Sequence, residues 1–120
     1  MAYLIDLPSF SDSRGSLSVV EKVLPFSIKR IFYIYDVKDS KRGGHRHHNT
    51  IQAAICISGE CKIYNNDNLK EDVFHLNSPS KCLLLETKDW HTMYDFSSGS
   101  ILLVLASEEF DSEDYIYSPY

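Results

Sequence analysis

The chain has 120 residues, a 43% apolar fraction and a formal net charge of −5 at pH 7. This length fits one domain, residues 1–120, and the apolar fraction excludes a disordered chain. The negative charge is atypical of general nucleic-acid binders, so no nucleic-acid partner is expected. The N-terminus turns acidic too early for a signal peptide, no apolar run reaches membrane-spanning length, and the three cysteines lack CxxC spacing. We therefore expect a cytoplasmic protein with free thiols and no membrane partner.

Short apolar runs rich in β-branched and aromatic residues follow one another along the chain, separated by turn residues. This pattern predicts strands at 17–23, 28–37, 52–58, 61–64, 73–76, 82–86, 91–96 and 101–107. Only the acidic segment 108–114 is expected to form a short helix. Many short strands at even spacing indicate an all-β sandwich or closed barrel, whose interior accommodates side chains or one small ligand.

The segment Arg42–His48, with the sequence RGGHRHH, contains three of the five histidines. Side chains alternate between the faces of a β-strand, so His45 and His47 share one face while Arg46 and His48 take the other. Two imidazoles on one face either bind a metal ion or transfer a proton. The residues around them decide between these two uses.

The histidine pair is followed by Gln52 and Gly59, and later by His91. This spacing resembles the two-part signature of the cupins, and the resemblance implies an all-β, cupin-type jelly-roll β-barrel of the RmlC-like kind. Metal-binding cupins carry a glutamate where this chain has Gln52, and a neutral amide does not offset the charge of a divalent ion. We therefore expect no metal and no cofactor.

A closer resemblance is to the nucleotide-sugar 3,4-ketoisomerases, WxcM-like metal-free cupins that act on dTDP-4-keto-6-deoxyglucose. It runs nearly end to end and rests on the order of segments 12–17, 25–30, 32–36, 42–47, 57–59, 90–91, 95–97, 104–107 and 115–116. The chain departs from the family at Arg46, His48, Thr92 and Tyr117, where the family usually has alanine, a basic residue, glutamate and arginine. Since small cupins commonly pair, the resemblance also implies a homodimer with exchanged strands.

The implied reaction moves the ketone of a dTDP-linked 4-keto-6-deoxyhexose from C4 to C3 through an enediolate. It requires a base, a proton donor and a group that holds the developing oxyanion. We expect His45 and His47 to transfer the proton, with His47 favoured as the base, and Tyr33 to supply a phenolic proton. The substrate-binding candidates are Arg14, Glu21, Arg30, Tyr35, Arg42, Gln52, Trp90 and His91.

Each candidate also has a simpler interpretation. Arginine forks bind the two phosphates of a nucleotide sugar, but an arginine is also an ordinary solvated surface residue. That simpler interpretation is strongest for Arg30 and weakest for Arg42, which lies beside the histidines. The tyrosines are equally suited to packing in a barrel, and His48 and His75 are expected to be surface or structural residues.

Three other functions stay open at this point. A nucleotide-sugar 3,5-epimerase uses the same deprotonation next to the 4-ketone but reprotonates a different carbon. A metal-dependent cupin would use His45, His47 and His91 as ligands. A non-catalytic cupin would bind the nucleotide sugar without turnover. The stereochemistry of the product at C4 does not follow from the sequence.

Overall fold

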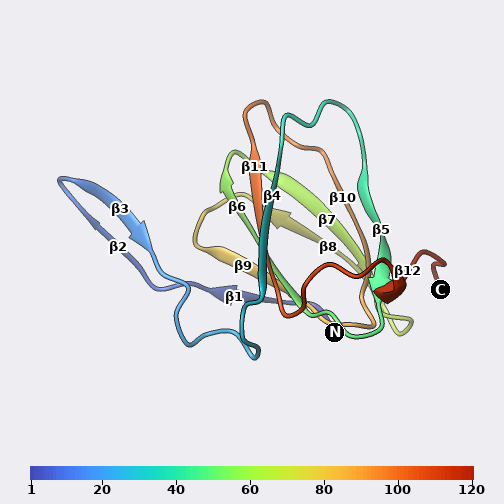
Figure 1. The fold of residues 1–120 in the computed structure, drawn as a ribbon. Helices are drawn as coiled ribbons and strands as arrows, with labels where there is room; N and C mark the ends of the chain where they lie inside the picture. The colour runs from blue at the N-terminus through green and yellow to red at the C-terminus, as the bar shows by residue number, and fades with distance from the viewer.

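A computed structural model describes residues 1–120 as strands joined by turns, with a single 3₁₀ turn near the C-terminus (Figure 1). The elements are β1 (Tyr3–Asp6), β2 (Ser9–Asp12), β3 (Gly15–Ser18), β4 (Arg30–Tyr35), β5 (Arg42–His47), β6 (Gln52–Ser58), β7 (Cys61–Asn66), β8 (Glu71–Leu76), β9 (Lys81–Leu85), β10 (Trp90–Tyr94), β11 (Ile101–Ala106), η1 (Ser112–Asp114) and β12 (Tyr115–Ile116). Two five-stranded antiparallel sheets, in the orders β1-β9-β6-β11-β4 and β12-β5-β10-β7-β8, form the two layers of a barrel. The all-β prediction is confirmed.

The main core lies between the two sheets. Alternate residues of β6 and β11, such as Ala54, Leu102 and Val104, pack there with Ile63 and Met93 from the opposite sheet. The sheet that contains β6 also buries its other face. Residues there, which include Leu7, Ala53, Ile55, Cys82, Leu84 and Leu105, pack under the loop that follows β3. Burial on both faces explains why β6, β9 and β11 are continuous apolar runs in the sequence.

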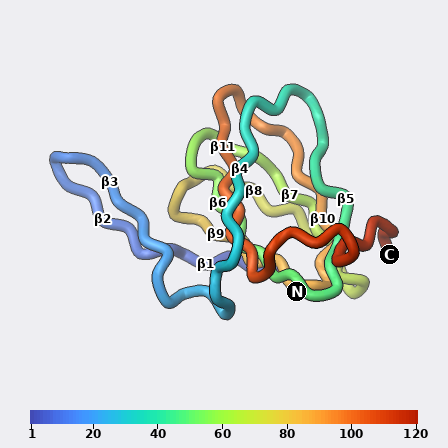
Figure 2. Tube along the Cα trace, in the orientation of Figure 1, coloured from blue at the N-terminus to red at the C-terminus, as the bar shows by residue number.

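The hairpin of β2 and β3 projects away from the barrel, as the blue segment of Figures 1 and 2 shows. All eight residues of its two strands are exposed, and Phe10 and Leu17 are paired across the strands with 64% and 58% of their surfaces accessible. An isolated two-stranded hairpin is marginally stable in water. Phe10 and Leu17 of this hairpin therefore lack a packing partner within their own chain.

Several predicted boundaries are wrong. The strand predicted at 17–23 ends at Ser18, because the chain leaves the hairpin and enters a loop in which Lys22 has a φ of 57°. The strand predicted at 28–37 is shorter, spanning β4 only, and Asp36 beyond it also has a positive φ of 57°. The predicted helix at 108–114 is the single turn η1, capped by Asp111, whose side chain accepts from the backbone N–H of Glu113.

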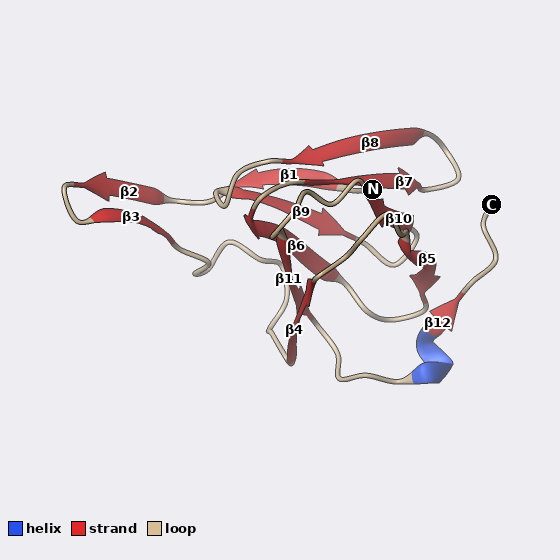
Figure 3. Ribbon diagram, turned by 90° about the horizontal axis from the view of Figure 1, so that it is seen from above, coloured by secondary structure: helices blue, strands red, loops and turns tan.

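The C-terminal segment closes against the second sheet. Figure 3 shows η1 and β12 beside the end of β5, and β12 pairs with β5 so that Tyr115 lies opposite His47. Cys56, Cys61 and Cys82 are buried free thiols, as predicted. The structure contains no helix long and apolar enough to cross a membrane.

Candidate active site

The glycine pair that precedes the histidines allows β5 and β10 to approach each other closely. Gly43 and Gly44 have φ values of 83° and 80°, which side chains other than glycine rarely adopt. The pairing of β5 with β10 shifts register here, between His91 and Thr92. A Cβ atom on Gly43 would lie 2.9 Å from the backbone oxygen of His91. The glycines therefore set His45 directly opposite His91 across the two strands.

Three histidine rings meet on the inner side of this strand pair. The ring centroids of His45 and His47 are 4.9 Å apart, and those of His45 and His91 are 5.0 Å apart. The predicted shared face of His45 and His47 is confirmed. His48 is exposed, and Arg46 places its guanidinium 4.4 Å from the Tyr120 ring centroid, away from the cluster.

Tyr115 completes the cluster and was not among the predicted site residues. Its ring centroid lies 4.7 Å from that of His45 and 4.8 Å from that of His47, because β12 pairs with β5 at this position. Tyr117 stacks on Tyr115 with a centroid separation of 6.1 Å. The only sequence signal for Tyr115 was its place in the Tyr-Ile pair of the tail.

Burial keeps all three histidines neutral at pH 7. It lowers the pKa of His45 to about 4, with a further decrease from His91 and an opposing hydrogen bond involving the backbone of Gly43. Burial and His45 lower the pKa of His47 to about 4, against an increase from Asp114. Burial likewise lowers the pKa of His91 to about 4. Neutral imidazoles have a free lone pair, so each ring is able to accept a proton.

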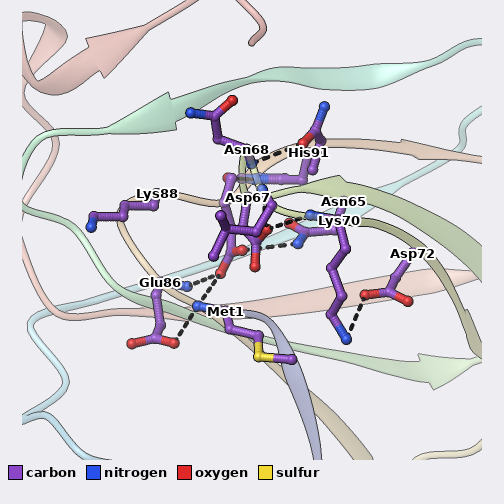
Figure 4. A network of polar contacts seen from close by, with 12 residues as sticks. Met1, Asn65, Asp67, Asn68, Lys70, Asp72, Glu86, Lys88 and His91 are labelled. Carbon is purple, nitrogen blue, oxygen red and sulfur yellow. Dashed lines mark hydrogen bonds and ion pairs between the residues drawn. The ribbon is translucent and has the colours of Figure 1, made fainter.

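His91 belongs to the network of polar contacts in Figure 4, and its buried part holds the ring in one orientation. Its Nδ1 lies 3.0 Å from the backbone oxygen of Asp89, and since a carbonyl only accepts, Nδ1 carries the hydrogen. The fully buried Asp89 carboxylate accepts from Asn65 Nδ2 at 2.8 Å and from the backbone N–H of Glu86 at 2.7 Å. Asp89 is therefore fixed, and His91 presents Nε2 as a hydrogen-bond acceptor.

Several buried polar atoms lack a hydrogen-bond partner. They are His47 Nε2, His91 Nε2, Gln52 Oε1 and Asn65 Oδ1, together with Arg46 Nε on the opposite face of β5. Buried polar atoms in folded proteins are normally paired, so a set of unpaired ones indicates a place for a ligand or ordered water. No group of three or more His, Cys, Asp or Glu side chains has the arrangement of a metal site.

The two arginine candidates of the first sheet and of β5 lie in different surroundings. Arg30 is half-buried, with its guanidinium 4.5 Å from the Phe32 ring centroid and 5.3 Å from that of Phe110. Its positive charge contributes to the lowered pKa of His47. Arg42 is exposed at the start of β5. Aromatic faces stabilise a partly desolvated guanidinium, so Arg30 is held in place, whereas Arg42 is free to move in solvent; both arginines stay candidates for binding a phosphate.

Four other candidates do not join the cluster within one chain. Tyr33 and Tyr35 are 62% and 59% exposed on β4, whose alternate residues face the inner core. Arg14 lies at the tip of the projecting hairpin and pairs with Asp12 at 2.7 Å. Glu21 is exposed on the following loop.

Trp90 and Gln52, two other substrate-binding candidates, lie closer to the histidine cluster. Trp90 is half-buried at the start of β10, and its Nε1–H donates to the backbone oxygen of Tyr117 at 3.2 Å. It therefore holds the C-terminal segment over the site. Gln52 is buried on β6, in the sheet opposite the histidines.

Two five-stranded sheets that enclose a histidine cluster define the class as a cupin-type jelly-roll barrel. Structural similarity supports this class: the dTDP-6-deoxy-D-glucose-3,5-epimerase RmlC from Legionella pneumophila superposes with a TM-score of 0.82 at 12% identity, over 95% of this chain and 70% of that one. This likeness concerns the fold alone.

The profile of the family described as "FdtA: WxcM-like, C-terminal" matches residues 2–120, and the chain belongs to this family. It is 40% identical over 116 residues to the TDP-4-oxo-6-deoxy-alpha-D-glucose-3,4-oxoisomerase of Aneurinibacillus thermoaerophilus, which covers 94% of this chain and 84% of the relative. It also resembles a histidine-to-asparagine mutant of a 3,4-ketoisomerase from Thermoanaerobacterium thermosaccharolyticum, solved with TDP-4-keto-6-deoxyglucose. That similarity has a TM-score of 0.93 and 39% identity over 98% of this chain and 87% of the other.

The buried histidines predict a loss of stability in mild acid. Unfolded histidines take up protons near pH 6.5, whereas His45, His47 and His91 resist protonation until about pH 4. Between these values the unfolded state binds more protons, so the free energy of unfolding falls as pH decreases from 6.5 to 4. Urea unfolding at several pH values measures this slope. A free energy that stays constant across this window would contradict the burial of the cluster.

Proposed function

We propose that this chain is a sugar-nucleotide 3,4-ketoisomerase, which moves the ketone of a dTDP-4-keto-6-deoxyglucose-type substrate from C4 to C3. The observation that carries the proposal is the cluster of neutral histidines in a barrel whose 40% identical relative bears that activity in its name. The enzyme would act in the biosynthesis of deoxysugars and deoxyaminosugars. Three buried free thiols favour a cytoplasmic location, where cysteines stay reduced.

In the proposed reaction, His47 removes the hydrogen on C3 as a proton, because the adjacent 4-ketone stabilises the resulting carbanion as an enediolate. The C4 oxygen gains a proton and the C3 hydroxyl loses one. A proton added to the C4 carbon then completes the 3-ketone. His45, 4.9 Å from His47 between ring centroids, donates or orients the returning proton. The Arg30 guanidinium stabilises the negative charge of the enediolate or the diphosphate.

Within one chain, Tyr33, Tyr35 and the hairpin residue Arg14 lie away from the histidine cluster. We propose a homodimer in which the β2–β3 hairpin of one chain packs on the partner. Phe10 and Leu17 are exposed on that hairpin, and Ile31, Tyr33 and Tyr35 are exposed on the outer face of β4. A face of this kind is typical of a surface that another chain covers. Exchange of the hairpin would carry Arg14 to the partner subunit, where Arg14 would bind the substrate.

Replacing both Phe10 and Leu17 with aspartate should convert the dimer to a monomer, because burial in the partner would desolvate two carboxylates. Light scattering coupled to gel filtration measures the mass. Val73→Asp is the matched control, since Val73 is 56% exposed on β8, away from the hairpin, and should leave the mass unchanged. A monomeric wild-type chain, or a double variant that still dimerises, would contradict the exchanged dimer.

Incubation of the purified chain with dTDP-4-keto-6-deoxyglucose in heavy water, followed by NMR, tests the activity. The expected result is a 3-keto sugar with deuterium at C4, where the returning proton is added. Absence of both would refute the proposal. The same spectra separate the open alternatives, because a 3,5-epimerase gives an inverted 4-keto sugar and a binding protein gives nucleotide-sugar binding without turnover.

The metal-dependent alternative needs its own measurement. Elemental analysis of protein purified without chelators should find no stoichiometric metal, since Gln52 supplies an amide in place of a carboxylate. Stoichiometric iron, manganese, nickel or zinc would overturn this part of the proposal.

A further inference from the structure

Asp114 is a buried carboxylate on the C-terminal segment that pairs with the histidine strand β5. It lies at the end of η1 and is only 6% exposed. Its Oδ1 accepts from the backbone N–H of Asn49 at 2.7 Å, and its Oδ2 accepts from the Thr50 hydroxyl at 2.5 Å. Its own backbone oxygen accepts from the N–H of His48 at 2.9 Å. Three consecutive residues that follow His47 are therefore bonded to this one aspartate.

These bonds join the C-terminal segment to the end of β5. The next residue, Tyr115, pairs with His47 across β12 and β5 and packs against its ring. The groups that surround His47 come from five elements: His45 on β5, His91 on β10, Arg30 on β4, Tyr115 on β12 and Asp114 on η1. Among these groups, Asp114 is the only acid.

Proton transfer changes the charge at His47. When the ring takes the C3 proton it becomes an imidazolium in a buried site, which Arg30 and burial both disfavour. A fixed carboxylate nearby offsets this cost. Asp114 raises the pKa of His47, and by the same interaction His47 lowers the pKa of Asp114.

We infer that Asp114 is a positioning residue for His47: it seats the end of β5 through Asn49 and Thr50, and its negative charge stabilises the protonated imidazole formed during the reaction. This inference rests on the proposed function for its catalytic consequence. The interaction between the two side chains exists whether or not the chain is an isomerase.

Asp114→Asn separates the charge from the hydrogen bonds. The amide oxygen still accepts from the Asn49 N–H, and the amide nitrogen donates to the Thr50 hydroxyl, which accepts after rotation. We expect kcat to fall roughly tenfold with KM changed less than about threefold, as for loss of part of the assistance to a general base. The NMR titration midpoint of the His47 Cε1–H should move to lower pH, as should the acidic limb of kcat. The melting temperature should change little.

Asp111→Asn is the matched control. It removes the same charge three residues earlier, where Asp111 is exposed and caps η1, a position that asparagine fills equally well. This variant should keep the kcat and the His47 titration of the wild type. If Asp114→Asn and Asp111→Asn have equal effects, the net charge of the segment matters and the position of Asp114 does not. An unchanged kcat and an unchanged His47 midpoint in Asp114→Asn would overturn the inference.

A second measurement covers the case in which Asp114→Asn fails to fold. In His47→Asn, the carboxyl carbon of Asp114 should titrate at a higher pH than in the wild type, because a cationic neighbour has been removed. An unchanged Asp114 titration would refute the coupling. Since both titrations need no turnover, they remain informative if the isomerase assay is negative, which would refute only the proposed function.

Discussion

Replacing His47 with asparagine should reduce kcat for the 3,4-ketoisomerisation by about a thousandfold, within the range of ~10²–10⁴ that a general base contributes. Asparagine fits the space of the ring but has no basic nitrogen to take the C3 proton. His45→Asn should cause a similar loss if the two rings share the transfer, as their 4.9 Å separation favours. Single-turnover assays by NMR with dTDP-4-keto-6-deoxyglucose measure both variants.

Loss of folding does not account for such a result. His47 Nε2 is buried without a hydrogen-bond partner, so its removal leaves no donor or acceptor newly unpaired at that atom. The melting temperature of His47→Asn measures any remaining effect on folding, such as that of the buried amide that asparagine introduces. His75→Asn is the control, because His75 is exposed and bonded to Glu60 on the surface, and it should retain full activity. Full activity in both His45→Asn and His47→Asn would remove the pair from the mechanism.

Gly43→Ala should destabilise the fold by about 3 kcal/mol and also impair activity. An alanine at a φ of 83° carries a backbone strain of roughly 1–2 kcal/mol. In addition, its Cβ would lie 2.9 Å from the backbone oxygen of His91, so one of the two strands must move. Since His45 and His91 face each other across these strands, movement separates the rings. Urea unfolding gives the free energy and the isomerase assay gives the activity.

Gly99→Ala isolates the strain from the clash. Gly99 has a similar φ of 73°, but a Cβ there meets no atom within 4 Å. It should therefore cost only about 1–2 kcal/mol, the strain alone, and leave activity unchanged. If the two alanine variants lose equal stability, the close approach of β5 and β10 is not what requires glycine at position 43.

Much of the fold follows from local patterns. Continuous apolar runs predict β6, β9 and β11, since strands buried on both faces have no polar alternation. Alternation also places His45 and His47 on one face, because the side-chain period of a strand is two. The weaker predictions are at strand ends and in the first thirty residues, where short serine-rich strands carry no burial signal.

The sequence by itself determined most of the barrel strands, the histidine pair and the family resemblance, because each depends on residues that are near one another or on motifs in a set order. It did not predict β1, β2 or β12. The tertiary structure decided which residues surround the pair. Alternation divides β4 into Tyr33 with Tyr35 and Phe32 with Ile34, yet both sets are large and apolar enough to be buried. Only packing against the opposite sheet turns the second set inward and leaves the tyrosines outside.

Tertiary packing also decided where Asp114, Tyr115 and Arg30 lie relative to the histidines. Asp114 and Tyr115 follow His45 and His47 by more than sixty positions and reach them through the pairing of β12 with β5. Arg30 comes from the other sheet and lies between the rings of Phe32 and Phe110. Contacts between distant segments arise from the closure of the barrel, which local spacing does not encode. The charge environment of His47, and with it the strength of the proposed base, is therefore a property of the folded chain.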